Sequence, residues 1–324
     1  MKVWKIVGPK TLSMEEEQGE LRPDYIKVKV IKLGLTGTDI AVYEGKTDIS
    51  LPIVPGRIAT GVVSEVNPGS SFRKGERVLL SPYIKDKKDR LLTRGLNVDG
   101  YLADYVVLPE SCVYALPESI TEDMGVFTEY ISIAAGLTDK LNLKREQYVA
   151  ILGADALGLI FAQLAIYYQA IPIIVDRSEK KLAEAAKFGI YYRINSAKQD
   201  AAKRIRQITC GKMADCTVFE CLSSQQPQLA FSLTAEGGKV GIVGYDRFVS
   251  KLNADIAAIM GRQLSVVGIN NGAADINTAI NLLANDVVKV DDIADKTVDF
   301  LASPDVFTEL ADEENNYLKI LIQC

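Results

Sequence analysis

The stretch LGADALG, residues 152–158, has the spacing of a phosphate-binding turn. The pattern G-x-G-x-x-G between a strand and a helix lets the backbone approach the pyrophosphate of a dinucleotide. Gly153 and Gly158 match its first and third glycines, and Asp155 stands at the second. A carboxylate there crowds and repels an anion, by about 1 kcal/mol at about 4 Å in water and several times more in a drier site.

The helix that follows this turn begins with Ala156 and Leu157, and a helix N-terminus attracts phosphate. Asp176 closes the next apolar run, where a carboxylate accepts hydrogen bonds from the adenosine ribose and favours NAD over NADP. Arg177 comes next and can tolerate a 2′-phosphate, so NADP is the alternative cofactor. A second alternative is a cofactor-free relic of the fold, because Asp155 damages the pattern.

The elements around the turn alternate strand and helix. Apolar runs at 147–152, 171–175, 214–222 and 238–243 predict strands, with a helix at 179–188 and another at 275–284. This alternation is typical of βαβ units in a parallel sheet. The first 120 residues are β-rich instead, with expected strands at 25–33, 61–66, 77–80 and 101–108, and a solvated charged loop at 85–94.

The composition excludes several classes of protein. The chain has 324 residues, 48% of them hydrophobic, a net charge of −5 and no histidine. This length favours two domains, and the acidic balance argues against nucleic-acid binding. No apolar run is long enough to span a bilayer, and no signal peptide is visible. Five cysteines without C-x-x-C spacing favour a reducing cytoplasm.

Several further motifs are spread along nearly the whole chain. They are GLTGTD (34–39), LPIVPGRIATGVVSEV (51–66), KGERVLL (74–80), DGYLADYVVLP (99–109), FTEYIS (127–132), LGADALG (152–158), EGGKVGIVG (236–244) and SVVGIN (265–270). Together they resemble the motifs of the medium-chain dehydrogenase/reductase superfamily, in its zinc alcohol, polyol and threonine dehydrogenase branch. The resemblance implies an α/β protein with a GroES-like β-rich catalytic domain, residues 1–130 and 269–324. A Rossmann domain with a doubly wound parallel sheet is then expected at 131–268. Gly244 and Asn270 would flank the nicotinamide.

The zinc ligands of that branch are largely replaced. Thr36 occupies the cysteine position, Arg57 the histidine position, and only Glu129 matches a ligand. One carboxylate cannot form the three-ligand site that catalytic zinc needs. The four-cysteine lobe expected between Ser81 and Asp99 has no cysteine. The sequence therefore predicts a protein without zinc.

Arg57 would place a permanent positive charge where zinc polarises a substrate oxygen. Glu129 is its expected partner, because a buried unpaired charge is costly. This ion pair is either a structural plug or an arrangement in which Arg57 acts as electrophile or substrate anchor. Thr38 matches the hydroxyl that relays a proton from the substrate, although a threonine here also serves simply as a turn residue. Asp39 is expected to organise the loop.

The leading interpretation is a zinc-independent NAD(P)-dependent oxidoreductase acting on a small alcohol, polyol, sugar or carbonyl compound. The alternative is a catalytically silent relative that serves as a binding or regulatory subunit. The apolar run at 264–269 resembles the edge strand that pairs across the family's dimer. The resemblance therefore implies a homodimer or homotetramer.

Overall fold

The computed structural model describes residues 1–220, 226–243, 256–312, 315 and 317–324. Contacts divide the chain into two compact units, Met1–Thr128 with Ile293–Cys324, and Glu129–Asp292. The boundary after Thr128 lies two residues before the predicted boundary, which was after residue 130. The second boundary was predicted after residue 268 and lies after Asp292, because residues 269–292 group with the parallel-sheet unit. Within that unit, the side-chain amide of Gln163 exchanges two hydrogen bonds with the backbone of Lys289, at 2.8 and 3.0 Å.

The first unit is built mainly of antiparallel strands. Its elements are β1 (Lys2–Gly8), β2 (Thr11–Glu16), β3 (Tyr25–Gly34), α1 (Gly37–Tyr43), β4 (Ile58–Val66), β5 (Arg77–Leu80), β6 (Tyr83–Lys85), β7 (Leu91–Thr93), β8 (Tyr105–Pro109), the 3₁₀ turn Glu110–Cys112, β9 (Val113–Ala115), α2 (Glu122–Gly125), β16 (Lys296–Asp299), the 3₁₀ turn Phe300–Ala302, α10 (Ser303–Leu310) and β17 (Ile320–Gln323).

Strand β3 is the centre of this unit's seven-stranded sheet, whose order is β16-β17-β3-β4-β5-β9 with β8 also on β3. Its sequence alternates, and Ile26, Val28 and Val30 are fully buried while Lys29 is exposed. Period-two alternation puts one face of a strand into the core. The chain's C-terminal strand β17 pairs with β3 at Leu33, so both ends of the sequence build one sheet.

The second unit alternates strands with helices. Its elements are α3 (Thr128–Leu141), which begins one residue before the division, β10 (Tyr148–Leu152), α4 (Ala156–Tyr167), β11 (Ile171–Asp176), α5 (Glu179–Lys187), β12 (Tyr192–Asn195), α6 (Ala201–Ile208), β13 (Ala214–Glu220), α7 (Gln226–Leu233), β14 (Thr234–Val243), α8 (Ile256–Gly261), β15 (Ser265–Ile269) and α9 (Ile276–Ala284).

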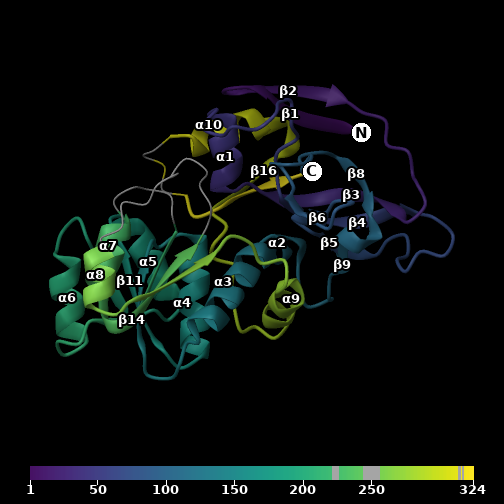
Figure 1. Cartoon of the computed structure of the whole chain (residues 1–324). Coiled ribbons are helices and arrows are strands. Elements are labelled where there is room, and N and C mark those ends of the chain that lie inside the picture. Colours follow the sequence, from purple (N-terminus) through teal and green to yellow (C-terminus); the bar gives the residue numbers. More distant parts are fainter. Residues whose placement is uncertain (221–225, 244–255, 313–314, 316) are drawn as a thin grey trace. The chain divides into compact units, whose positions relative to one another are not determined.

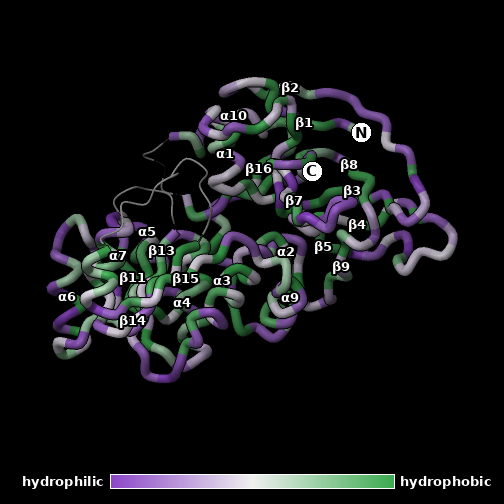
Figure 2. The backbone as a smooth tube through the Cα atoms, viewed as in Figure 1, coloured by the Kyte–Doolittle hydropathy of each residue, from purple (hydrophilic) through white to green (hydrophobic). Residues whose placement is uncertain are grey.

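The six strands of this unit are parallel and run in the order β12-β11-β10-β13-β14-β15. Figure 1 labels two of them, β11 and β14, among the helices of the unit. Counted along the chain, the strand order is 3-2-1-4-5-6, the Rossmann order, and ligands bind such sheets where the order reverses. The reversal lies between β10 and β13, whose residues Val149 and Cys216 are in register. The strands of this sheet are mostly hydrophobic (Figure 2), and β10, β11 and β13 are mostly buried, as expected for strands with both faces covered.

Most predicted elements agree with these bounds to within two residues. β4 and β14 begin earlier than predicted, at Ile58 instead of 61 and at Thr234 instead of 238, and the last two residues of the strand predicted at 214–222 lie outside the described residues. The expected strand at 101–108 is shorter, because β8 begins only at Tyr105. The solvated loop expected at 85–94 is wrong in part, since β6 and β7 pair there as a hairpin around a largely exposed turn at 86–90. Its turn is held by Asp86, whose Oδ1 accepts the backbone N–H groups of Lys88 and Arg90 at 2.8 and 2.9 Å.

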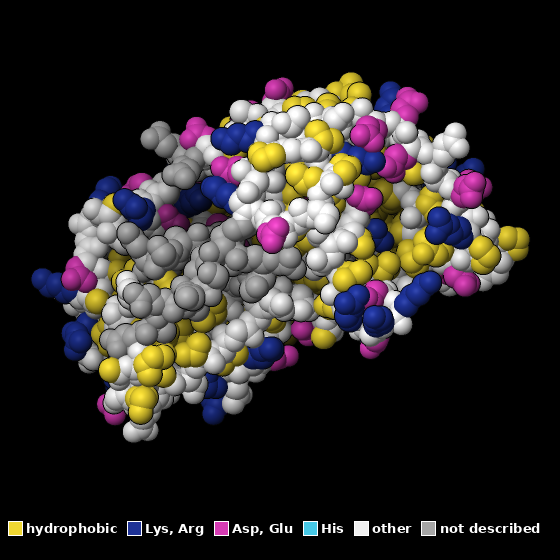
Figure 3. Space-filling model, turned by 45° about the horizontal axis from the view of Figure 1, so that its top comes forward, with side chains coloured by type: hydrophobic (Ala, Val, Ile, Leu, Met, Phe, Trp, Pro, Cys, Tyr) yellow, Lys and Arg dark blue, Asp and Glu magenta, His cyan; other side chains and the backbone are white. Residues whose placement is uncertain are grey.

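The surface carries charges of both signs. Figure 3 shows Lys and Arg side chains interspersed with Asp and Glu on the face it presents. Within the described ranges, no helix has the length and apolar character needed to cross a bilayer.

Candidate functional site

The turn between β10 and α4 has the backbone that the glycine pattern predicts. Gly153 has a φ of +115°, which a side chain strongly disfavours. Its N–H donates to the carbonyl of Val175 at 2.9 Å. A Cβ on Gly158 would lie 2.1 Å from the Gly153 carbonyl oxygen. Gly153 is therefore required by its backbone conformation, and Gly158 by the close approach of α4 to the end of β10.

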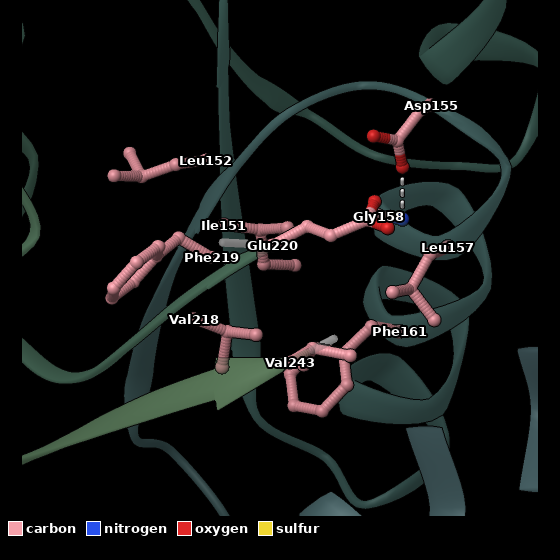
Figure 4. Close-up of a pocket in the computed structure, with 10 residues that line it drawn as sticks. All are labelled: Ile151, Leu152, Asp155, Leu157, Gly158, Phe161, Val218, Phe219, Glu220 and Val243. Atoms are coloured by element: carbon pink, nitrogen blue, oxygen red, sulfur yellow. Dashed lines mark hydrogen bonds between the residues drawn. The ribbon is translucent and has the colours of Figure 1, made fainter. Parts of the chain in front are cut away.

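Asp155 is the N-cap of α4 rather than a free carboxylate in the turn. Its Oδ1 accepts the backbone N–H of Gly158 at 2.9 Å (Figure 4). An N-cap side chain satisfies donors that the first helical turn leaves open. The carboxylate thus lies at the helix N-terminus, beside the buried residues Ala156 and Leu157 that were predicted to face the cofactor.

The surroundings of Asp155 disfavour its charged form. Burial raises the pKa of Asp155, and the negative charge of Asp176 raises it further. The Gly158 N–H and the charge of Lys181 oppose this increase in the pKa. The direction follows from desolvation, which disfavours an ionised carboxylate.

Two backbone N–H groups hold the side chain of Asp176, which the sequence predicts as a ribose acceptor. Its Oδ2 accepts the N–H of Ala154 at 2.8 Å, and its Oδ1 accepts the N–H of Ser178 at 2.7 Å. Each carboxylate oxygen has a second lone pair, so a ribose hydroxyl can still donate to it. Arg177 follows and is exposed.

The two remaining cofactor predictions concern the nicotinamide end. Gly244 lies outside the described residues. Asn270 follows the carboxyl end of β15 and lines a hollow together with Ile242, Gly268 and Asp275. Its side-chain oxygen accepts the Asn271 amide at 2.7 Å. The position at the strand ends fits a ligand-binding role, since ligands of open α/β sheets bind there.

Glu220 was missed by sequence reasoning. It is the last residue of β13, and its side chain extends toward the Asp155–Gly158 turn (Figure 4). The predicted strand at 214–222 placed it inside the strand. The sequence did contain a signal for it: an acidic residue near the carboxyl end of a predicted strand. That strand is one of the two between which the strand order of the sheet reverses, which is where ligands bind.

In the first unit, the GLTGTD motif forms the start of α1. Thr36 is the N-cap, and its hydroxyl donates to Asp39 Oδ2 at 2.7 Å, while the Asp39 N–H donates to Thr36 Oγ1 at 3.4 Å. The Thr36 N–H also donates to Asp39 Oδ2 at 2.7 Å, which completes a capping box. Thr38 is partly buried in the first turn of α1.

Asp39 also ties this helix to the PGR turn. Its Oδ1 accepts the Gly56 N–H at 2.7 Å, and the side chain is 2% exposed. Gly56 has a φ of +87°, and a Cβ there would lie 2.5 Å from Leu33 Cδ1. The prediction that Asp39 organises the loop is confirmed, and the brace fixes the backbone that precedes Arg57.

Arg57 faces an aromatic ring within its own unit. Its guanidinium carbon lies 5.9 Å from the ring centroid of Tyr83, which is within cation–π range. Tyr83 is buried. Glu129, at the start of α3, is 3% exposed and belongs to the second unit. The Arg57–Glu129 pair stays a prediction.

The three positions at which the resembling branch holds zinc carry a hydroxyl, a guanidinium and a carboxylate in this chain. The Thr36 hydroxyl is used in the capping box, Arg57 carries a positive charge, and Glu129 supplies one carboxylate. Zinc needs three or four nitrogen, sulfur or carboxylate ligands. Among the residues that the structure describes, no group of three or more His, Cys, Asp or Glu side chains could hold a metal.

Comparisons with known proteins agree with this architecture. Residues 22–118 match the alcohol dehydrogenase GroES-like domain family, and residues 156–285 match the zinc-binding dehydrogenase family. A zinc-type alcohol dehydrogenase-like protein of Haemophilus influenzae is 26% identical over 310 residues, covering 91% of this chain and 90% of that protein. Sorbitol dehydrogenase 2 of Saccharomyces cerevisiae is 27% identical over 295 residues, covering 83% and 82%.

A solved structure is also similar. It is described as a short chain alcohol dehydrogenase from Escherichia coli CFT073, complexed with NADH, and superposes with a TM-score of 0.91 at 23% identity. The match covers 100% of this chain and 99% of that one. A GroES-like unit combined with a Rossmann unit is the architecture of NAD(P)-dependent alcohol dehydrogenase-like oxidoreductases, and this chain is one of that class. The chain belongs to the medium-chain dehydrogenase/reductase superfamily, in its zinc-type alcohol dehydrogenase group.

Proposed function

We propose that the chain is a zinc-independent NAD(P)-dependent oxidoreductase in which Arg57 supplies the positive charge that zinc gives its relatives. The observation that carries this proposal is the replacement at the ligand positions. A guanidinium follows the Asp39-braced turn, and the Thr36 hydroxyl is already engaged. A fixed cation stabilises a developing alkoxide or polarises a carbonyl without any metal.

The roles of the remaining residues follow from this charge. Arg57 holds the substrate oxygen, and Thr38 takes the proton from or returns it to that oxygen. Glu129 balances the guanidinium, because burying a lone cation is costly. When bound, the nicotinamide cofactor supplies the hydride chemistry. Asp176 holds the adenosine ribose and favours NAD, while the exposed Arg177 keeps NADP as the second candidate.

The substrate class in this proposal is a small alcohol, polyol, sugar or carbonyl compound. It rests on the relatives, since sorbitol dehydrogenase 2 is named for a polyol. An arginine also suits a hydroxyl-rich or anionic substrate, because its planar fork donates several hydrogen bonds in fixed directions.

The experiment is to dialyse the protein against a chelator and follow NAD(P)⁺ reduction with a panel of alcohols and polyols. Turnover on the best substrate should persist after chelation. Arg57→Gln should lower kcat by about 100-fold, the size of effect expected when one charge-stabilising donor is removed. Arg57→Lys keeps the charge and should retain more activity. Unchanged turnover in Arg57→Gln would contradict the role proposed for Arg57.

Thr38→Val tests the proton relay in the same assay. We expect a loss of about 10- to 100-fold in kcat, with Thr38→Ser largely active, because only the hydroxyl takes part. If Thr38→Val retained full activity, Thr38 would be only a residue of the turn.

A catalytically silent binding subunit is the second candidate, and the Asp155 carboxylate at the pyrophosphate position favours it. Titration calorimetry with NADH and NADPH separates the two. Binding of either cofactor together with turnover supports the enzyme, and the absence of binding to both supports the silent subunit.

We also propose that the chain forms a homodimer or homotetramer through β15. This strand is at the edge of the parallel sheet, and its Val266 side chain is 44% exposed. An exposed apolar edge strand is suited to pairing with another chain. Light scattering on the wild type and on Val266→Lys checks this, and a monomeric wild type would contradict it.

A further inference from the structure

The helix N-terminus that a dinucleotide needs already holds a carboxyl group of the protein. In dinucleotide-binding turns the pyrophosphate accepts N–H groups at the start of the helix. Here the Asp155 carboxylate accepts the Gly158 N–H at 2.9 Å. This carboxyl group therefore lies where the diphosphate of the cofactor would accept its hydrogen bonds, and when ionised it places a negative charge there.

A second carboxylate faces the same turn. Glu220 extends from the end of β13 toward Gly158, and the two acids line one small hollow (Figure 4). The other walls of this hollow are mostly apolar and include Ile151 and Phe161. Charges that are poorly solvated by such walls repel each other more strongly than charges in open water.

The charged groups that face Asp155 come from three elements. They are Asp176 at the end of β11, Lys181 in α5 and Glu220 at the end of β13. Two of the three are acidic, so a bound diphosphate would add negative charge to a turn in which acids already outnumber bases. Removing the charge of Asp155 is the change that most directly relieves this repulsion, because Asp155 itself caps the helix.

We propose that Asp155 is a built-in competitor for the cofactor diphosphate, and that the dinucleotide binds together with one proton taken up by this carboxyl group. The step converts –COO⁻ and H⁺ into –COOH. The carbonyl oxygen keeps the Gly158 N–H, and the new O–H donates to a diphosphate oxygen. Protonation thus turns a repelling anion into a hydrogen-bond donor without dismantling the cap. This inference rests on the proposed dinucleotide-binding function.

The direction of the resulting pH dependence is fixed. Burial and Asp176 raise the pKa of Asp155, and a bound diphosphate raises it further because it adds negative charge. Binding therefore takes up a proton, and the affinity for the dinucleotide increases as the pH falls. Proton linkage limits the slope to about tenfold in Kd per pH unit for one group.

The probe for the test is ADP-ribose, whose diphosphate is fully ionised across neutral pH, and adenosine is the matched ligand without a diphosphate. Calorimetric titrations from about pH 6 to about pH 8 should show that the Kd of ADP-ribose rises with pH, by up to about tenfold per unit. The Kd of adenosine should stay constant. Asp155→Asn should remove the slope and bind ADP-ribose about tenfold more tightly at the alkaline end, because asparagine keeps the cap without the charge.

Three further variants sharpen the test. Glu220→Gln should tighten binding but keep the slope, which separates the two acids. Asp200→Asn alters an exposed N-cap on α6, where Oδ1 accepts the Lys203 N–H at 3.0 Å, and should leave the titrations unchanged. Asp155→Gly restores the glycine of the pattern and should bind at least as tightly as Asp155→Asn.

The outcomes distinguish this inference from the function on which it rests. A pH-independent Kd for ADP-ribose in the wild type, or a slope that survives in Asp155→Asn, overturns the inference and leaves the oxidoreductase standing. If neither the wild type nor Asp155→Gly binds ADP-ribose or NADH at any pH, both the inference and the proposed function are wrong.

Discussion

Asp39 in the first unit and Asp155 in the second are both acidic residues at a helix N-terminus, yet their surroundings differ. Asp39 accepts hydrogen bonds from Thr36 and from Gly56, and it thereby joins α1 to another loop. Asp155 accepts from Gly158 of its own helix, at a turn with the backbone of a dinucleotide site. The same local interaction joins two loops in the first unit, and we propose that in the second it competes with the cofactor diphosphate.

This difference shows that the role of a carboxylate at a helix N-terminus depends on whether a ligand would accept the same backbone N–H groups. The Gly56 N–H belongs to a structural turn, so its partner can be permanent. The N–H groups at the start of α4 are those that a diphosphate would take. A change at Asp39 should therefore affect stability, whereas a change at Asp155 should affect mainly binding and its pH dependence.

The largest stability effect is expected for Asp39→Ala, which leaves buried N–H groups without their acceptor. We expect the free energy of unfolding of the first unit to fall by about 3 kcal/mol. Urea unfolding followed by fluorescence measures this selectively, because the single tryptophan, Trp4, lies in that unit. Asp200→Ala, which removes an exposed N-cap in the second unit, should leave this transition unchanged. If Asp39→Ala lowered the free energy of unfolding by less than about 1 kcal/mol, Asp39 would not be the brace between α1 and the Gly56 turn.

A smaller loss is expected for Gly158→Ala, because its Cβ would meet the Gly153 carbonyl oxygen at 2.1 Å. Overpacking of this kind costs about 1–3 kcal/mol. Thermal unfolding monitored by far-ultraviolet circular dichroism gives the shift. The matched control is Gly268→Ala, where a Cβ would have no neighbour within 4 Å; equal effects in the two variants would contradict the close approach.

Asp155→Asn should change stability in a pH-dependent way. The pKa of Asp155 is raised above its ordinary value of 3.8 in the folded protein, so the folded state holds its proton more tightly than the unfolded chain. The stability contribution of this group is present below pH 3.8 and is lost as the pH rises through the folded-state pKa. The wild type should therefore lose more stability than Asp155→Asn on going from acid to neutral pH, and parallel melting curves for the two would contradict this sign.

The smallest effect is expected in the β6–β7 hairpin. The side-chain hydrogen bond from Arg90, at 2.7 Å, lowers the pKa of Asp86, with backbone N–H groups adding to it. The contribution of Asp86 is thus present above its ordinary pKa and is lost as the pH falls through the lowered value. Asp86→Asn should speed amide exchange at Lys88 and Arg90 alone, and unchanged exchange at both would show that the turn does not depend on this carboxylate.

The sequence was sufficient for the fold because its signals are local. Apolar runs of strand length, the Gly153 and Gly158 spacing and the alternation in β3 each follow from backbone sterics and burial. The role of Asp39 was also accessible, since the motif T-x-x-D predicts a capping box. Its second partner, Gly56, lies 17 residues away and depends on tertiary folding.

The candidate site was harder to predict for the same reason. Glu220 approaches the dinucleotide turn only because β13 pairs beside β10, and no local pattern reports that pairing. The hairpin at 83–93 was missed because its residues are highly charged, while Asp86 supplies the turn that charge alone does not reveal. Side chains whose partners are distant in sequence are those that single-sequence reasoning leaves open.

The central claim is that a guanidinium has replaced the metal of the family in this chain. Its most direct test is to measure zinc in the purified protein, after growth and dialysis with added Zn²⁺, and to assay NAD(P)⁺-dependent turnover on the same sample. The account predicts far less than one zinc per chain, with turnover that chelation does not change and that depends on Arg57. About one tightly held zinc per chain, with turnover abolished by its removal, would contradict the account.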